Sequence, residues 1–352
     1  MDDTKQLLTR FQGKELKTLK PEVQASTARY SPCGKLLAAA MYDARVRRWD
    51  VTTNECVERT PVAGHQGWCT DVAFQPAGEL AFSADSWGQI QAWPYLAEEA
   101  KPTWANATAH DGWVRSLAVS GDGKTLASSG KDKFVRLWST TTGEKLGEWK
   151  SEHDPYCLAF APDGTSMFVG DDRGLTRQVK LDGGLVREFA AAELYTLSRL
   201  QDVGGVRCLA MNKEGTTLAV GGTIPKNGAT ITGIPLVVLF DIATGERREK
   251  IELGDTADVN VVDLHLHDAG FVVAVTCGSP GKGQLLYWRP TDKEPFYREK
   301  KYANPQSISW RSDGKQFAVV ATNGGSNGNG RSLKDGKYVG NHSPIYLLQL
   351  PE

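Results

Sequence analysis

The chain has 352 residues, of which 40% are apolar, and its 41 basic and 42 acidic residues give a formal net charge of −1. This balance argues against a broad surface for nucleic acid or for an anionic membrane. The longest apolar runs are far shorter than a membrane span, and the first six residues, Met-Asp-Asp-Thr-Lys-Gln, lack the basic and apolar regions of a signal peptide.

The first predicted strand covers about residues 12–20 and follows residues 1 to about 11, which we expect to be loose or helical. Its sequence, from Gln12 to Leu19, resembles Thr142 to Trp149, which forms the fourth strand of a later repeat. At the other end, Pro344 to Leu350 is predicted to be a third strand with no fourth strand after it. We therefore predict that the first strand pairs with this last one, which removes two exposed strand edges.

Between these two strands a four-stranded pattern recurs seven times. It is clearest from Ala109 to Trp149, where apolar segments at 114–119, 125–128, 134–138 and 144–149 are separated by turns that contain glycine. One such sheet is not stable alone, so the copies are expected to pack on one another. The glycine of the first turn recurs at spacings of mostly 41 to 55 residues, typical of a β-propeller, as Gly34, Gly78, Gly123, Gly164, Gly215, Gly270 and Gly314.

Several repeats share further residues. Trp49-Asp50 ends a third strand, His65 and His110 open repeats, and Asp132 stands six residues before Trp138. In these residues the chain resembles the WD-repeat family. The resemblance implies an all-β, seven-bladed β-propeller of four-stranded antiparallel blades, a single domain over residues 1–352 whose ring is closed by the N-terminal strand completing the last blade. It does not indicate a function, because this fold hosts many unrelated functions.

Three insertions interrupt the later repeats, at residues 190–202, 222–234 and 322–343. The composition and apolar spacing of Ala190 to Leu200 predict a short helix. The resemblance implies that all three insertions emerge on the top face of the propeller, over blades five to seven. Loops on a rigid scaffold often carry function, so a small-molecule pocket beneath them stays an open alternative.

The cysteines are spread at about one per repeat and include no Cys-x-x-Cys pair. We interpret them as buried thiols in a reducing compartment, and we predict a cytoplasmic protein without a disulfide framework or a zinc site. They are Cys33, Cys56, Cys69, Cys157, Cys208 and Cys277.

Three patterns match chemical sites, and each has a structural explanation. His110, Asp132 and either Ser128 or Ser129 suggest a nucleophilic triad, but the positions recur in part as His65 and Asp43. The resemblance instead implies a hydrogen-bonded structural tetrad that includes Trp138. His265-x-His267 lacks a third metal ligand nearby, and the Gly-x-Ser-x-Gly match at Gly324 to Gly328 lies in a Gly/Asn loop without the strand and helix that a nucleophile elbow needs. We predict no catalytic residue, no cofactor and no metal.

Large aromatic and basic residues gather at the start of the innermost strands and in the turns between second and third strands. Trp87 stands where the tetrad aspartate is found in blade three, so we expect an aromatic ring to replace that polar group. Tryptophan, tyrosine and arginine are the residue types that anchor protein interfaces. The predicted protein-binding residues, on one connected area of the top face, are Tyr42, Trp68, Trp87, Trp113, Arg115, Lys131, Tyr156 and Arg207.

The sequence thus predicts a non-catalytic interaction scaffold that binds a protein or peptide through its top face, as a subunit of a larger complex and without nucleic acid or membrane insertion. The mixture of indole rings with basic side chains suits a partner segment that is both acidic and apolar. The alternatives are a propeller enzyme of the hydrolase or lactonase type and a small-ligand sensor with a site in the central channel. A ubiquitin-ligase receptor is a further alternative, although its usual Trp-Asp-x-Arg is missing because Val51 and Thr52 follow Trp49-Asp50.

Overall fold

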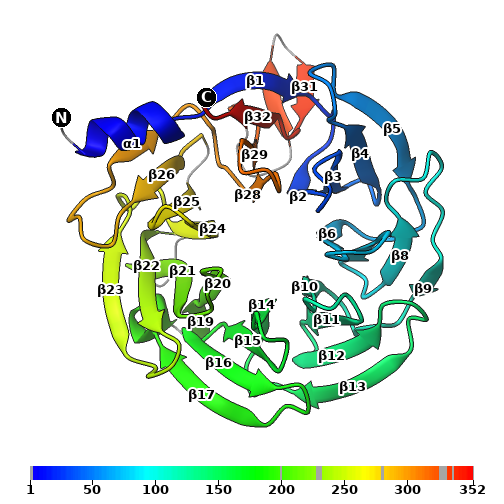
Figure 1. The fold of residues 1–352 in the computed structure, drawn as a ribbon, viewed down its shortest axis with the longest axis horizontal. Helices are drawn as coiled ribbons and strands as arrows, with labels where there is room; N and C mark the ends of the chain where they lie inside the picture. The colour runs from blue at the N-terminus through cyan, green and yellow to red at the C-terminus, as the bar shows by residue number, and fades with distance from the viewer. Residues whose placement is uncertain are drawn as a thin grey trace.

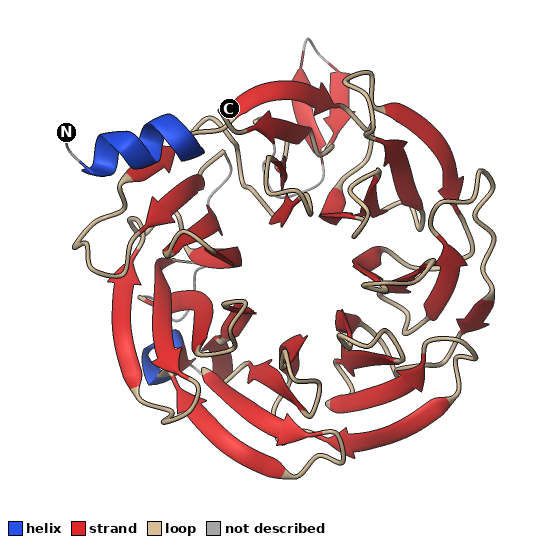
Figure 2. Cartoon of the chain, viewed as in Figure 1, coloured by secondary structure: helices blue, strands red, loops and turns tan. Residues whose placement is uncertain are grey.

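Seven four-stranded antiparallel sheets stand as blades around a central opening in the computed structural model of the chain (Figure 1). The structure describes residues 3–198, 200–226, 232–278, 281–324, 331–334 and 337–351. The predicted fold class, an all-β seven-bladed propeller, is therefore confirmed. Within the described residues, α1 (Asp3–Phe11) and a short 3-10 turn η1 (Ala192–Leu194) are the helical segments (Figure 2).

In blades one to six the strands run outward from the opening in chain order. Blade one is β2 (Ala25–Tyr30), β3 (Leu36–Met41), β4 (Val46–Asp50) and β5 (Val57–Val62), and blade two is β6 (Cys69–Phe74), β7 (Leu80–Asp85), β8 (Ile90–Pro94) and β9 (Trp104–Asn106). Blade three is β10 (Val114–Val119), β11 (Thr125–Gly130), β12 (Phe134–Ser139) and β13 (Lys145–Lys150), and blade four is β14 (Pro155–Phe160), β15 (Ser166–Asp171), β16 (Leu175–Lys180) and β17 (Leu185–Ala190). Blade five is β20 (Val206–Met211), β21 (Thr217–Pro225), β22 (Gly233–Asp241) and β23 (Arg247–Glu252), and blade six is β24 (Asn260–His267), β25 (Phe271–Cys277), β26 (Gln284–Trp288) and β27 (Tyr297–Glu299).

The last blade joins the two ends of the chain. It is built from β28 (Ser307–Trp310), β29 (Gln316–Val320), β32 (Ile345–Gln349) and, outermost, β1 (Lys14–Leu19). Strand β1 pairs antiparallel with β32, with Lys14 opposite Gln349 and Leu19 opposite Ile345. The predicted closure of the ring by the N-terminal strand is therefore present, and it covers the edge that β32 would otherwise expose.

The connection between blades four and five is not the predicted helix. Residues 192–194 form η1, and β18 (Tyr195–Ser198) and β19 (Gln201–Gly204) then form a two-stranded hairpin. The apolar spacing is satisfied differently, because Leu194 is buried against the cluster around Phe189 and Val206. Helix propensity over so few residues is easily overridden by such packing.

The other two insertions are described only in part. Strands β21 and β22 continue their pairing to Pro225 opposite Gly233, so the first part of the 222–234 insertion extends a hairpin. The 322–343 insertion contains a small hairpin of β30 (Arg331–Lys334) and β31 (Lys337–Gly340). Residues 227–231, 325–330 and 335–336 lie outside the described residues, and so does most of the Gly324 to Gly328 motif.

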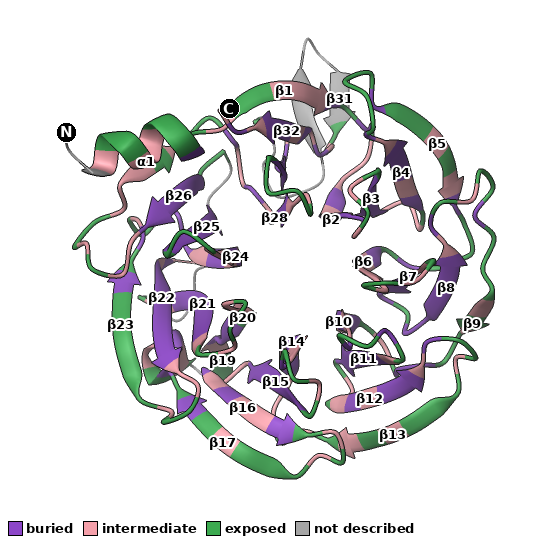
Figure 3. Ribbon diagram, in the orientation of Figure 1, coloured by how far each residue is buried: buried purple, intermediate pink, exposed green. Residues whose placement is uncertain are grey.

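The core lies between neighbouring blades, so the middle strands are covered on both faces. Strand β3, Leu-Leu-Ala-Ala-Ala-Met, is buried along its whole length, and Leu36, Ala38 and Ala40 pack on Trp93 of the next blade. The outermost strands β13, β17 and β23 face solvent (Figure 3). This arrangement explains why second strands such as β3 and β25 are nearly continuous apolar runs while the outermost strands are mostly polar.

The predicted tetrad is formed in blade three. His110 Nε2 lies 2.7 Å from Ser128 Oγ, and His110 Nδ1 lies 2.9 Å from Asp132 Oδ1. Trp138 Nε1 donates to the same Ser128 hydroxyl at 2.8 Å, so the serine is Ser128 and not Ser129. Burial lowers the pKa of His110, which keeps the ring neutral at neutral pH.

In blade two the expectation that Trp87 replaces the tetrad aspartate is wrong. The carboxylate comes from Asp85, two residues earlier, and it accepts hydrogen bonds from the backbone N–H groups of Gln66, Trp87 and Gln89 at 2.9–3.0 Å. Strand pairing makes Asp85 the counterpart of Gly130 in blade three. A side chain at position 130 would clash with His110, because a Cβ there would lie 2.2 Å from His110 Nδ1. In blade three the carboxylate therefore comes from Asp132, two residues later.

A fully buried arginine ties blade one to blade two. The Arg48 guanidinium donates five hydrogen bonds to backbone carbonyls: two to Thr60 at 2.7 and 3.0 Å, and one each to Tyr95 at 3.3 Å, Ala97 at 2.8 Å and Glu98 at 2.9 Å. No carboxylate in the described part of the chain forms an ion pair with it. Burial, and after it the charge of Arg59, lowers the pKa of Arg48.

Candidate protein-interaction surface

Four aromatic side chains from blades one to three line a shallow cavity at one face of the ring. The rings of Tyr42 and Trp68 stack with centroids 4.9 Å apart and planes 7° apart, and Trp68 meets Trp113 edge-on at 5.9 Å. With Trp87 they line a cavity of about 480 Å³. Trp68, Trp87 and Trp113 keep 49%, 66% and 38% of their surface exposed, which is unusual for side chains of this size.

The backbone holds these rings at the face where the innermost strands begin, which we call the top face. Trp68 and Trp113 directly precede β6 and β10, and their carbonyls accept hydrogen bonds from the N–H groups of Ser86 and Lys131 at 2.9 Å. Tyr42 N–H donates to the Gln24 carbonyl at the equivalent place of blade one at 2.9 Å. The rings of Tyr42, Trp68 and Trp113 are therefore attached to backbone that is held by a hydrogen bond between the start of the first strand and the end of the second strand of the same blade.

A β-bulge repeated around the ring presents the next set of side chains. In six of the innermost strands, β2, β6, β10, β14, β20 and β24, the register shifts near the start of the strand, which leaves the second or third residue without a partner. A bulge re-aims the side chain of the unpaired residue. The bulged residues line a cavity of about 360 Å³ in the central channel and are Ser26, Thr70, Arg115, Tyr156, Arg207 and Val262.

The bulges join the aromatic cavity to the channel. Arg115 lies over the Trp113 ring at 6.0 Å and over the Tyr156 ring at 4.9 Å, and Arg207 lies over Tyr156 at 4.3 Å. The tyrosine ring thus contacts two guanidinium groups, and both contacts are favourable cation–π interactions. Arg115 also forms an ion pair with Asp154 at 2.8 Å.

We name this continuous set the aromatic surface; it contains Tyr42, Trp68, Trp87, Trp113, Arg115, Tyr156 and Arg207. Lys131, the eighth predicted residue, is exposed and is joined to it through its backbone bond to Trp113. The structure therefore brings all eight predicted residues into one area. Sequence reasoning missed Ala44, Gln66, Gly67 and Ser86, which also line the aromatic cavity and are small or polar residues without a distinctive pattern.

The acidic groups deeper in the channel have structural partners. Asp263 forms an ion pair with Arg29 at 2.9 Å and accepts from the N–H of Ile308 at 3.0 Å. Asp71 accepts from the N–H of Leu117 at 2.9 Å, and burial raises its pKa. Both carboxylates bridge to the backbone of an adjacent blade, so they hold the ring together rather than remaining free for a ligand.

Two repeats of the chain match a family model. The model of the family described as "WD domain, G-beta repeat" matches residues 55–93 and 104–139, the stretches that supply the two tetrads of blades two and three. The chain is a seven-bladed β-propeller with WD repeats in blades two and three. Other blades keep the strand pattern with only part of the tetrad: blade four keeps the buried Asp171, and blades one and six keep the tryptophan of the third strand as Trp49 and Trp288.

Three curated relatives illustrate the range of WD-repeat proteins that the chain is similar to. Nuclear distribution protein PAC1 of Coccidioides posadasii is 24% identical over 241 residues, which cover 50% of this chain and 50% of that protein. Apoptotic protease-activating factor 1 of Rattus norvegicus is 28% identical over 160 residues, 45% of this chain and 12% of that protein. Transducin beta-like protein 3 of Bos taurus is 36% identical over 115 residues, 32% and 14%. The chain spans half or less of the length of these relatives.

The remaining expectations concern metals, thiols and membranes. Among the described residues no group of three or more His, Cys, Asp or Glu side chains could hold a metal ion, and His265 and His267 lie with ring centroids 6.2 Å apart and planes nearly perpendicular. All six cysteines are free, but the prediction that all are buried is wrong, because Cys33 is exposed and Cys277 is half-buried. No helix in the described ranges is long and apolar enough to cross a bilayer.

Proposed function

We propose that this WD-repeat propeller is a non-catalytic scaffold that binds a protein or peptide through the aromatic surface. The observation that supports it is the exposure of three tryptophan side chains in one cavity at the top face. Burying such rings against a partner is favourable by about 25 cal/mol per Å² of apolar surface. The scaffold role also agrees with the resemblance to WD-repeat proteins whose names describe distribution and regulatory factors.

The charges of the surface favour a partner segment that is acidic as well as apolar. Arg207 and Lys131 are exposed, and neither forms an ion pair with a described residue. Arg115 is already paired with Asp154, so it contributes mainly through its stacking on Trp113 and Tyr156. An extended segment that places an apolar side chain in the aromatic cavity and a carboxylate near Arg207 fits this arrangement. The free thiols agree with a cytoplasmic location.

The test is affinity purification of the full chain from native cell extract, with bound proteins quantified against a Trp68→Ala/Trp113→Ala variant. A control variant, Leu146→Ala/Leu185→Ala, removes two exposed apolar side chains from the outer strands β13 and β17. We expect one group of proteins to be lost with the tryptophan variant and retained with the control.

A direct binding measurement on that partner then gives the size of the effect. Trp113→Ala is expected to weaken binding by about 2 kcal/mol, which is roughly a 30-fold increase in the dissociation constant. Arg207→Glu is expected to weaken the binding of an acidic partner more than a neutral substitution at the same position does. If both tryptophan variants bind every partner as the unmodified protein does, the aromatic surface is not the binding site.

A further inference from the structure

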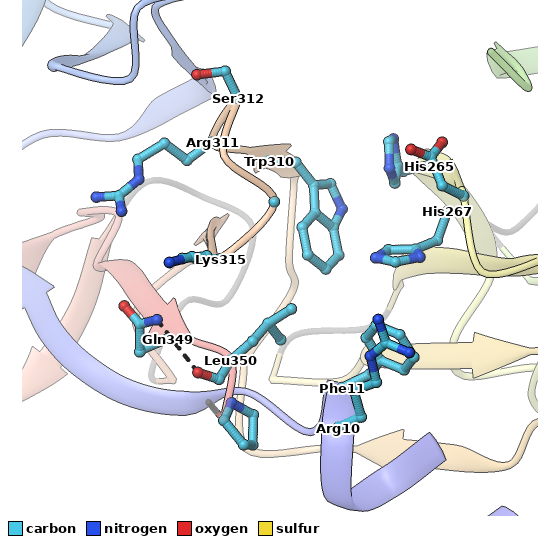
Figure 4. Close-up of a pocket in the computed structure, with 13 residues that line it drawn as sticks. Arg10, Phe11, His265, His267, Trp310, Arg311, Ser312, Lys315, Gln349 and Leu350 are labelled. Atoms are coloured by element: carbon cyan, nitrogen blue, oxygen red, sulfur yellow. Dashed lines mark hydrogen bonds between the residues drawn. The ribbon is translucent and has the colours of Figure 1, made fainter. Parts of the chain in front are cut away.

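A third cavity lies on the bottom face, where the innermost strands end, and belongs to none of the features above. Its volume is about 750 Å³, within the range of small-molecule sites. Four segments that are distant in sequence surround it: the end of α1, the end of β24, the end of β28 with the following turn, and the end of β32 with the residues after it. Figure 4 shows their side chains gathered around one space.

The wall of this bottom cavity is aromatic. Trp310 contacts His265 at 5.4 Å in a nearly parallel arrangement and His267 at 5.1 Å edge-on. His267 also meets the Phe11 ring edge-on at 4.8 Å. Leu350 adds an apolar side chain opposite the histidines (Figure 4). Because these rings pack on one another, they form a continuous aromatic wall against which a planar aromatic group can lie.

The polar groups of the wall are mainly hydrogen-bond donors. Trp310 Nε1 is buried and has no hydrogen-bond partner among the described residues. His267 Nδ1 accepts a hydrogen bond from the N–H of Ala269 at 3.1 Å, so the neutral ring carries its proton on Nε2. Burial, and after it the neighbouring His267, lowers the pKa of His265 to about 4, so this ring is also uncharged at neutral pH.

The rim is basic. Arg10, Arg311 and Lys315 stand around the opening against one acidic residue, Asp268. Arg311 is paired with Asp313 at its side, whereas Arg10 and Lys315 form no ion pair within the described parts of the chain. A ligand that enters this cavity therefore meets the side chains of Arg10 and Lys315, which form no ion pair among the described residues, and a carboxylate is the group that complements them.

We propose that the bottom cavity is a binding site for a small planar aromatic carboxylate. The ring of such a ligand lies against the wall formed by Trp310, His267 and Phe11, and its carboxylate faces the basic rim that carries Arg10 and Lys315. This site is independent of the aromatic surface, because it lies at the opposite ends of the innermost strands. The propeller then has a small-molecule binding site on the bottom face and a protein-binding surface on the top face.

The probe for the test is 1-naphthoate, with 1-naphthylmethylammonium as a cation of the same ring system. Binding is measured by titration while the indole N–H signals are followed by ¹H–¹⁵N NMR, and the Trp310 signal is assigned with Trp310→Phe. For a ligand of this size we expect a dissociation constant of about 1 mM or tighter, a shift of the Trp310 signal, and at least about tenfold weaker binding of the cation.

The variant that tests the charges is Arg10→Gln/Lys315→Gln, which changes two exposed side chains and leaves the wall intact. Its control is Lys35→Gln/Lys124→Gln, since each of these lysines follows the turn glycine of its blade as Lys315 does. We expect the first variant to bind naphthoate about tenfold more weakly and the control to bind it unchanged.

Three results would overturn the proposal: no binding of naphthoate, binding that leaves the Trp310 signal in place, or equal binding by the two double variants. A capped Glu-Trp-Glu tripeptide provides the last arm. If it moves the Trp310 signal at concentrations at least tenfold lower than naphthoate does, the cavity is a docking site for a peptide side chain and the small-molecule assignment is wrong.

Discussion

The buried Arg48 offers a sharp test of how adjacent blades are held together. A lysine at this position keeps the charge and most of the apolar stem, but its ammonium has only three donors and no planar fork. At least two of the five hydrogen bonds to backbone carbonyls are then lost. Arg48→Lys therefore measures the geometry of the guanidinium rather than its charge.

The magnitude follows from these contacts. A hydrogen bond from a charged group contributes about 1.5–3 kcal/mol, and the low end applies because Thr60 and Glu98 are exposed and water can reach their carbonyls. Loss of two bonds therefore costs about 3 kcal/mol. With an unfolding entropy of about 2.1 cal/mol/K per residue, a chain of 352 residues has about 0.7 kcal/mol/K, so the melting temperature should fall by about 4 °C.

Differential scanning calorimetry of both chains measures this shift, and Arg47→Lys is the control. Arg47 precedes Arg48 in the same strand, and it forms half-exposed ion pairs with Glu58 at 3.0 Å and Asp43 at 3.6 Å. Such pairs contribute at most about 1 kcal/mol, so the control should lower the melting temperature by no more than about 1 °C. Equal shifts in the two variants would show that the carbonyl contacts of Arg48 contribute no special stability.

Three further predictions concern closure and the tetrads. Deleting residues 1–20 removes β1 and exposes the edge of β32, so we expect aggregation or a large fall in melting temperature, and a monomer that melts as the full chain does would contradict the closure. Asp132→Ala should destabilise the fold by roughly 1–3 kcal/mol in urea unfolding and leave partner binding by the folded protein unchanged, because the carboxylate supports His110 and not the aromatic surface. Burial opposes ionisation of Asp85, but hydrogen bonds from His65 and the backbone outweigh it and hold its pKa well below the usual range. This stabilisation is fully present above the unfolded pKa of about 4 and is lost as pH falls below it, so the stability difference between Asp85→Asn and the unmodified protein should shrink between about pH 5 and pH 2.5.

Local patterns in the sequence are sufficient to predict the seven blades and the closure of the ring. Turn glycines such as Gly34, Gly123 and Gly314 adopt φ values near +70°, which other residues reach only with strain, so their spacing marks the first turn of each blade directly. The start of the innermost strands could be aligned from these positions, and that alignment gave the residues of the aromatic surface. The bulges that aim Arg115, Tyr156 and Arg207 have no sequence signature, because they depend on pairing with the second strand.

The sequence does not predict the features that depend on contacts between segments distant in the chain. The carbonyl partners of Arg48 lie 12 to 50 residues away in the chain, and the sequence alone does not show that they converge. In the sequence, His265 and His267 suggest only a partial metal site, because their aromatic neighbours Phe11 and Trp310 come from α1 and from the next blade. The position of the blade-two carboxylate was misjudged for a similar reason, because Asp85 and Asp132 reach the same place from different backbone positions.

The pairing of β1 with β32 also sets an order of events during synthesis. The residues that pair, Lys14 and Gln349, are separated by 335 positions (349 − 14). At about 5–20 residues per second, β1 waits roughly 17–67 s after its own emergence before its partner strand exists. During that interval the β1 segment has no partner strand on either edge. Its sequence, Lys-Glu-Leu-Lys-Thr-Leu, contains three charged residues, which favour solvation over pairing with another nascent chain. The polar character of the first strand thus protects the chain until its last strand arrives.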